Sequence, residues 1–103
     1  MLKFFEDWAE ENQNYWKQYD INVDEICRSN MYVEMIIIKH STTHALGQIE
    51  IRAGCGADGN LYLLDFMAVK VVGEYSFNRH YEFTDTYDLD EWQEEYISFM
   101  CGL

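Results

Sequence analysis

The spacing of apolar residues along this chain changes twice, and this change constrains the fold more than any other feature. In the first segment, large apolar and aromatic residues recur every three or four positions, the period of one helix face. From Asp20 onward apolar and polar residues alternate, as in a β-strand, and near Leu89 the helical period returns. The sequence therefore predicts a helix, then several strands, then a second helix.

The first helix is predicted over roughly residues 2–19. Acidic residues are concentrated in its first half and Lys17 lies near its end, an arrangement that the helix dipole favours. Such an aromatic-rich stripe needs a broad partner surface, such as a β-sheet. The stripe predicted to face inward consists of Leu2, Phe5, Trp8, Ala9, Asn12, Tyr15, Trp16 and Tyr19.

The middle of the chain predicts a series of strands joined by short turns. We expect a short edge strand over residues 21–25 and longer strands over residues 31–40, 44–53, 61–69 and 71–83, the last with a bend near Gly73. Residues 41–43 and the glycine-containing segment 54–60 are typical of turns. Connections this short favour an antiparallel meander over crossover units.

The second helix is predicted over roughly residues 89–101. Asp88 and Glu91 have the spacing of the N-cap and N3 positions of a capping box. The predicted fold class is α+β: an antiparallel sheet of four or five strands with N- and C-terminal helices packed on it. A chain of 103 residues suits a single domain, over residues 1–103.

The composition is strongly acidic. Nineteen Asp and Glu residues and seven Lys and Arg residues give a formal charge of −12. This charge excludes a protein that grips nucleic acid or an anionic membrane through a general basic surface. The longest strongly apolar stretch, residues 35–38, is far shorter than the about twenty residues of a membrane helix. The N-terminal residues also lack the pattern of a signal peptide, so we expect a cytoplasmic protein.

Chemistry-bearing motifs are scarce. Cys27, Cys55 and Cys101 are odd in number and widely spaced, and we interpret them as reduced thiols. His40 and His44 flank a predicted turn, which leaves a metal site as a minor alternative. The sequence shows no arrangement typical of a catalytic centre, so we expect a protein that is not an enzyme and has no cofactor.

The C-terminal segment combines acidic and aromatic residues. No basic residue follows Arg79. Carboxylates can pair with the Lys and Arg residues of a partner, and aromatic side chains can anchor an interface. The alternative interpretation is a solvated helix face whose aromatic residues point to the core. The residues predicted to bind a partner are Glu82, Asp85, Tyr87, Asp88, Asp90, Glu91, Glu94 and Glu95.

The chain also resembles a known class of proteins over nearly its whole length. The resemblance rests on the Trp-bearing first helix, on residues 20–24 (DINVD), 47–51 (GQIEI) and 59–65 (GNLYLLD), and on the acidic-aromatic C-terminus. Together these segments resemble the small immunity proteins of bacterial contact-dependent growth inhibition systems. The most similar group is paired with toxins that are tRNA nucleases acting with elongation factor Tu.

This resemblance implies a non-enzymatic inhibitor. It would bind the C-terminal domain of its cognate toxin and block the basic active-site or substrate-binding surface, and elongation factor Tu would join a larger complex through the toxin. Two alternatives stay open on the sequence alone. One is an acidic nucleic-acid mimic that inhibits another nuclease, of the anti-restriction or anti-CRISPR type, and the other is a small metal- or ligand-binding domain.

Overall fold

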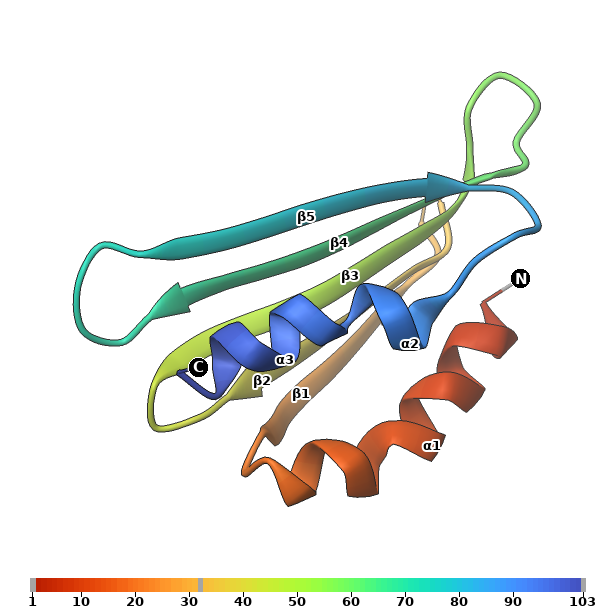
Figure 1. Cartoon of the computed structure of the whole chain (residues 1–103). Coiled ribbons are helices and arrows are strands. Elements are labelled where there is room, and N and C mark those ends of the chain that lie inside the picture. Colours follow the sequence, from red (N-terminus) through yellow and green to blue (C-terminus); the bar gives the residue numbers. More distant parts are fainter. Residues whose placement is uncertain (1, 32, 103) are drawn as a thin grey trace.

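The computed structural model, which describes residues 2–31 and 33–102, contains one antiparallel sheet with helices packed on it (Figure 1). The strands are β1 (Asn22–Ser29), β2 (Met35–Ser41), β3 (Ala45–Cys55), β4 (Leu61–Lys70) and β5 (Ser76–Phe83). The helices are α1 (Lys3–Gln18), α2 (Leu89–Trp92) and α3 (Glu94–Met100). The predicted α+β class with terminal helices is confirmed. Within the described range, none of the helices has the length and apolar character needed to cross a membrane.

The five strands follow one another in the order β1-β2-β3-β4-β5, so each connection is a hairpin. Because side chains alternate between the two faces of a strand, the register assigns each row of residues to one face. One row faces the helices and consists of His40, Gly47, Ala68 and Phe77. The adjacent row faces away from them and consists of Lys39, Gln48, Met67 and Asn78.

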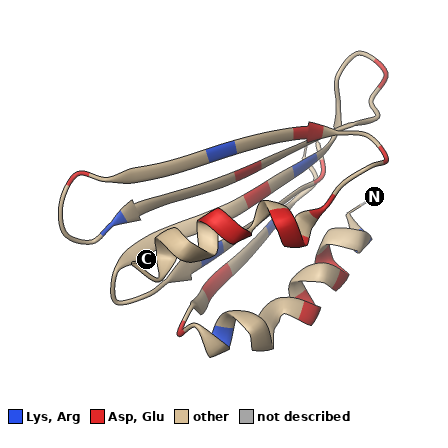
Figure 2. Cartoon of the chain, viewed as in Figure 1, with Lys and Arg blue, Asp and Glu red and all other residues tan. Residues whose placement is uncertain are grey.

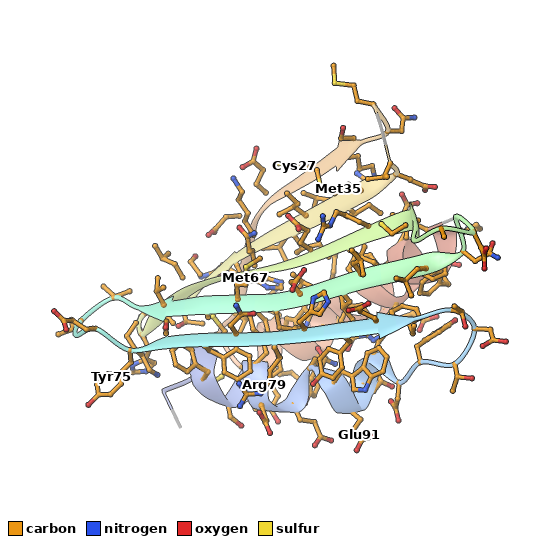
Figure 3. All side chains as sticks on the ribbon, turned by 90° about the horizontal axis from the view of Figure 1, so that it is seen from above. Cys27, Met35, Met67, Tyr75, Arg79 and Glu91 are labelled. Atoms are coloured by element: carbon orange, nitrogen blue, oxygen red, sulfur yellow. The ribbon has the colours of Figure 1, made fainter. Side chains whose placement is uncertain are left out.

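All the helices cover the same face of the sheet (Figure 1). On the α1 side, the ring of Trp16 lies 4.6 Å from that of His40 on β2. On the C-terminal side, Trp92 of α2 stacks on Tyr81 of β5 with ring centroids 4.4 Å apart. Figure 3 shows the two sides together: Met67 lies on the side of the sheet away from the helices, whereas Glu91 lies on the outer surface of the helical layer. The other face of the sheet is bare of helices in the described chain.

The core fills the space between the sheet and the helices. Its largest fully buried side chains include Trp16, Tyr96, Phe5 and Phe66. Burial of each such side chain stabilises the fold by about 1.5–3 kcal/mol. At one point the helical layer comes so close to β3 that only glycine fits. A Cβ at Gly47 would lie 2.6 Å from both Tyr96 Oη and Met100 Sδ.

Several predicted boundaries were wrong. β1 extends to Ser29 rather than ending near residue 25, because it pairs with β2 up to Met35. Residues 31, 33 and 34, predicted in a strand, belong to the β1–β2 connection, and residue 32 lies outside the described residues. Residues 71–75 form the β4–β5 connection instead of the start of a strand. The predicted second helix is interrupted at Gln93, which separates α2 from α3.

Candidate functional site

A buried polar network joins α1 to the C-terminal helices. Gln93 is only 3% exposed and its amide bonds to two residues of α1. Its Nε2 donates to Asn12 Oδ1 (3.0 Å), and its Oε1 accepts from Trp16 Nε1 (2.9 Å). Asn12 Nδ2 donates in turn to the carbonyl of Trp8 (2.8 Å). Because these buried groups have partners in each other, the network fixes the two helical segments in one relative position.

Two of the predicted site residues, Asp90 and Asp88, hold the start of α2 in place, and Asp90 also extends this network to the surface. Asp90 accepts a 2.9 Å hydrogen bond from Trp8 Nε1 and so links the start of α2 to α1. Asp88 is the N-cap of α2, and its Oδ1 accepts from the backbone N–H of Glu91 at 3.0 Å. The predicted capping position of Asp88 is confirmed. Both carboxylates therefore hold a helix in place as well as contributing charge.

Tyr15 and Tyr19 lie on the surface, contrary to the prediction that they point inward. Their side chains are 36% and 42% exposed, and their rings meet edge to face with centroids 5.2 Å apart. Trp16 fills the position over the sheet at this level of α1, so its neighbour Tyr15 turns toward the C-terminal helices. Partial burial raises the pKa of Tyr15, and the nearby Tyr19, Glu94 and Asp90 raise it further.

An acidic surface flanks the line where α1 meets α2 and α3, and in it Asp90 and Glu94 lie close enough to Tyr15 to raise its pKa. We call it the acidic seam and define it by Glu11, Tyr15, Asp90, Glu91 and Glu94. Glu11 precedes Tyr15 by one helical turn, so the two side chains are neighbours on α1. Among the described residues, Glu11, Glu91 and Glu94 have no ion-pair partner on this chain. Figure 2 shows the acidic bands of the helices on the same side of the molecule.

Negative charge is concentrated in the helical layer as a whole. The three helices carry eight carboxylates and two lysines, a formal charge of −6 out of −12. The other five basic residues lie on the strands, one on each. The carboxylates of the seam are exposed, so a basic partner can reach them.

Three other predicted residues lie near the seam without forming part of it. Glu95 makes a 2.8 Å ion pair with Arg79 of β5, which neutralises it locally. In the loop that precedes α2, Asp85 accepts from the hydroxyl of Thr84 at 3.1 Å. The ring of Tyr87 lies 4.7 Å from that of Phe4, so Tyr87 covers the start of α1 and remains 43% exposed.

Glu82 does not share this surface, contrary to the prediction. Its neighbours on β5, Tyr81 and Phe83, pack toward the helices, so Glu82 points to the bare face of the sheet. There His80 bridges two carboxylates, with Nδ1 2.7 Å from Asp65 Oδ1 and Nε2 3.2 Å from Glu82 Oε2. The hydrogen bond to Asp65 is the main cause of the raised pKa of His80.

The histidines proposed as a minor metal site are not arranged as ligands. His40 is buried in the core, where its Nδ1 shares a 2.7 Å hydrogen bond with Tyr96 Oη, and burial lowers its pKa to about 4. His44 lies in the β2–β3 connection, beside Gly102. Over residues 2–31 and 33–102, no group of three or more His, Cys, Asp and Glu side chains is placed to hold a metal ion. The three cysteines are all unpaired, as predicted.

Sequence reasoning missed the contribution of α1 to this surface. Helical spacing alone does not separate Glu11 and Tyr15 from the residues of α1 that point to the core. They lie beside an acidic surface because α3 packs next to them. The one available signal was the acidic bias of the first helix, which the helix dipole also explains.

Comparisons with known proteins add no relatives to this description. The chain matches no protein-family model, and no curated protein or solved structure is similar to it.

Proposed function

We propose that this protein is a non-enzymatic inhibitor that binds a basic nuclease toxin, as an immunity protein of a contact-dependent growth inhibition system does. The observation that carries the proposal is the acidic seam, where Asp90 of α2 and Glu94 of α3 lie near Tyr15 of α1, whose side chain is 36% exposed. A nuclease that holds RNA needs a positively charged cleft, and such carboxylates can occupy it in place of phosphates.

The rigidity of the seam supports a binding role. Asp90 is held by Trp8, and Gln93 fixes α1 against α2 and α3 through buried hydrogen bonds. A surface whose backbone is already ordered loses little conformational freedom on binding, which favours affinity. Tyr15 and Tyr19 supply large amphipathic rings of the kind that dominate binding energy at protein interfaces.

The net charge supports the same role through the rate of association. Attraction between a protein of charge −12 and a basic partner raises association rates to about 10⁸–10⁹ M⁻¹s⁻¹ at low salt, compared with about 10⁵–10⁶ for neutral pairs. Fast capture suits an inhibitor that must act before a toxin cleaves its RNA. In this proposal elongation factor Tu joins only through the toxin, and the protein contacts neither nucleic acid nor membrane.

The test is direct binding to a basic nuclease toxin domain, which on this proposal is one encoded beside this protein. We expect a complex of one copy of each, measured by calorimetry at moderate salt, and loss of the nuclease activity at the same ratio. The absence of a complex under these conditions would overturn the proposed function.

Matched charge variants test whether the seam is the surface involved. Glu11→Gln, Glu91→Gln and Glu94→Gln together change the charge from −12 to −9, as do Asp58→Asn, Glu74→Gln and Glu82→Gln, which lie off the helices. We expect the seam variant to slow association by about tenfold at low salt, and the control variant to slow it much less. Stopped-flow measurements at two salt concentrations give both rates. Equal effects would assign the binding to net charge alone and not to the seam.

A further inference from the structure

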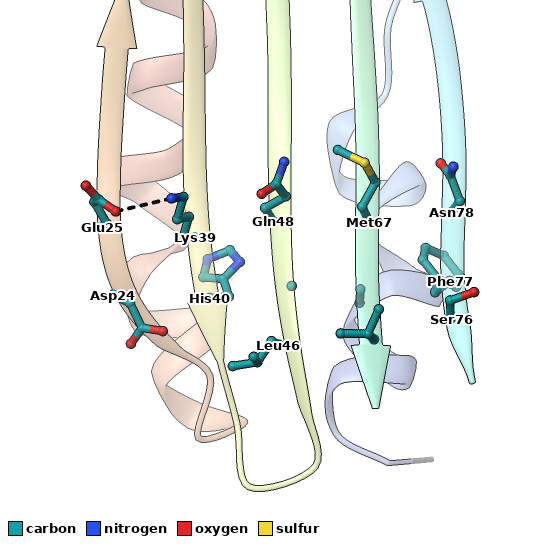
Figure 4. Close-up of a pocket in the computed structure, with 13 residues that line it drawn as sticks. Asp24, Glu25, Lys39, His40, Leu46, Gln48, Met67, Ser76, Phe77 and Asn78 are labelled. Carbon is teal, nitrogen blue, oxygen red and sulfur yellow. Dashed lines mark ion pairs between the residues drawn. The ribbon is translucent and has the colours of Figure 1, made fainter. Parts of the chain in front are cut away.

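The bare face of the sheet is hollowed across all five strands. The hollow measures about 980 Å³, and one complete register row runs across it. Figure 4 shows this row side by side from β1 to β5: Glu25, Lys39, Gln48, Met67 and Asn78. It lies on the face opposite the acidic seam, so a partner seated on the seam leaves it accessible.

One side of the hollow is apolar and exposed. Leu46 and Val69 face each other in the β3–β4 register and are 54% and 50% exposed. Met67 adds its side chain to the floor beside them, and Val71, just beyond β4, is 57% exposed. Leu46, Val69 and Met67 therefore give the hollow an exposed apolar strip on a strongly charged protein.

The β1 side of the hollow is acidic. Glu25 pairs with Lys39 at 3.4 Å, and Asp24 accepts a 3.0 Å hydrogen bond from the hydroxyl of Ser41. This side carries two carboxylates and one ammonium group, a formal charge of −1. The hollow thus offers an apolar strip on β3 and β4 and a site for a cation on β1.

The dimensions fit a helix of a partner protein. With neighbouring strands about 4.8 Å apart, five strands span about 19 Å, which is the length of about 13 helical residues. A helix laid on a sheet is also the usual way to bury an open sheet face. A second copy of this chain is disfavoured as the occupant, because two molecules of charge −12 repel each other.

We propose that this hollow is a second docking site, which binds an amphipathic helix with leucine-like residues on one face and lysine or arginine on the other. The apolar face of that helix covers Leu46, Met67 and Val69, and one of its cations reaches Asp24 and Glu25. This site is independent of the acidic seam, so the protein can bind two partners at once.

The probe is a synthetic 14-residue helix with leucine on one face and lysine on the other, added to the full chain. We follow the backbone amide chemical shifts of the protein by NMR. We expect the peptide to change them most in the residues of β1–β4 that line the hollow. The peptide with glutamate in place of lysine should not bind. Replacement of Leu46 and Val69 by Asp should weaken binding by about tenfold or more, because the apolar contact is lost. If the contact were purely electrostatic, the added negative charge would strengthen binding of the lysine peptide instead.

Two further variants keep the test decisive. Asp24→Asn with Glu25→Gln leaves the apolar strip intact and should weaken binding severalfold at low salt, even if the Asp variants fail to fold. Glu91→Gln with Glu94→Gln alters the seam and should leave the affinity nearly unchanged. Shift changes confined to the helices, equal affinity for the hollow variants, or no binding of the lysine peptide would each overturn the proposal.

Discussion

At the scale of single residues, His40 is the most unusual member of the core. Its ring is 1% exposed and lies between Trp16 and Tyr96. Tyr96 bonds to Nδ1, whereas Nε2 has no hydrogen-bond partner among the described residues. Because a charged imidazole cannot be solvated there, burial lowers the pKa of His40 to about 4, and the opposing effect of Asp24 is smaller.

This pKa makes stability depend on pH. The unfolded chain binds a proton at His40 near pH 6.5, and the folded chain only near pH 4. Between these values the unfolded state binds more protons at His40 than the folded state does, so the free energy of unfolding falls as the pH drops from 6.5 to 4. Above pH 6.5 the contribution of the neutral His40 to stability is fully present. The loss attributable to His40 is about 3 kcal/mol. Urea denaturation at pH 7, 5.5 and 4 measures it.

The control for this prediction is His40→Gln, whose amide can still bond to Tyr96. Carboxylates titrate in the same range, so the decisive quantity is the difference between the two proteins. His80→Gln is a second control, because the raised pKa of His80 contributes in the opposite direction, with stability lost as the pH rises. Parallel pH profiles for wild type and His40→Gln would contradict the prediction.

At the scale of elements, the contact between α3 and β3 depends on the absence of a side chain. Gly47 lies opposite His40 in the register, and Tyr96 and Met100 of α3 occupy the space above it. Tyr96 can therefore reach His40 across the backbone of β3.

Gly47→Ala is expected to destabilise the protein by about 1–3 kcal/mol, because the new methyl group forces Tyr96 and Met100 to move. Thermal and urea denaturation measure the loss. The matched control is Gln48→Ala, the next residue of β3, whose side chain faces the bare side. If both variants unfold at the same midpoint, α3 does not press on β3 as described.

The sequence predicts the elements better than their ends. Periodicity is enough to predict a helix with Trp8 and Trp16 inside, the meander, and the cap at Asp88, because these depend on local spacing. The length of β1 depends on pairing with β2, and the break at Gln93 depends on side chains of α1 more than seventy residues away. Such long-range partners leave no periodic signal in one sequence.

The candidate site could be predicted only in part. The acidic residues of α2 and α3 were found from composition, because charge needs no knowledge of the fold. Glu82 was wrongly grouped with the acidic residues of the helices, because a strand sends consecutive side chains to opposite faces and only the packing of Tyr81 shows which face is covered. The hollow on the bare face requires the register of all five strands, which no local pattern provides.

At the scale of the whole molecule, charge is distributed unevenly. Among the basic residues on the strands, Arg28, Lys39, Arg52 and Arg79 each pair with at least one carboxylate of this chain. Over residues 2–31 and 33–102, by contrast, the carboxylates of the acidic seam have no ion-pair partner. A folded chain of charge −12 therefore carries a self-repulsion that an expanded chain would relieve.

Salt is therefore expected to stabilise the protein. Raising NaCl from about 10 mM to about 500 mM screens this repulsion and should increase the free energy of unfolding by about 1 kcal/mol. Urea titrations at both concentrations measure the change. The Glu11→Gln, Glu91→Gln, Glu94→Gln variant should respond less, and a loss of stability with salt would mean that ion pairs outweigh the repulsion.

The network around Gln93 also has a consequence for synthesis on the ribosome. The partner of Asn12 is Gln93, which is synthesised 81 positions later. At about 5–20 residues per second, translation of this stretch takes roughly 4 to 16 seconds. Until then the indole N–H groups of Trp8 and Trp16 have no acceptor from the C-terminal helices. Chains released before that point expose these tryptophans to chaperones and proteases, so premature termination yields products that the cell can recognise and degrade.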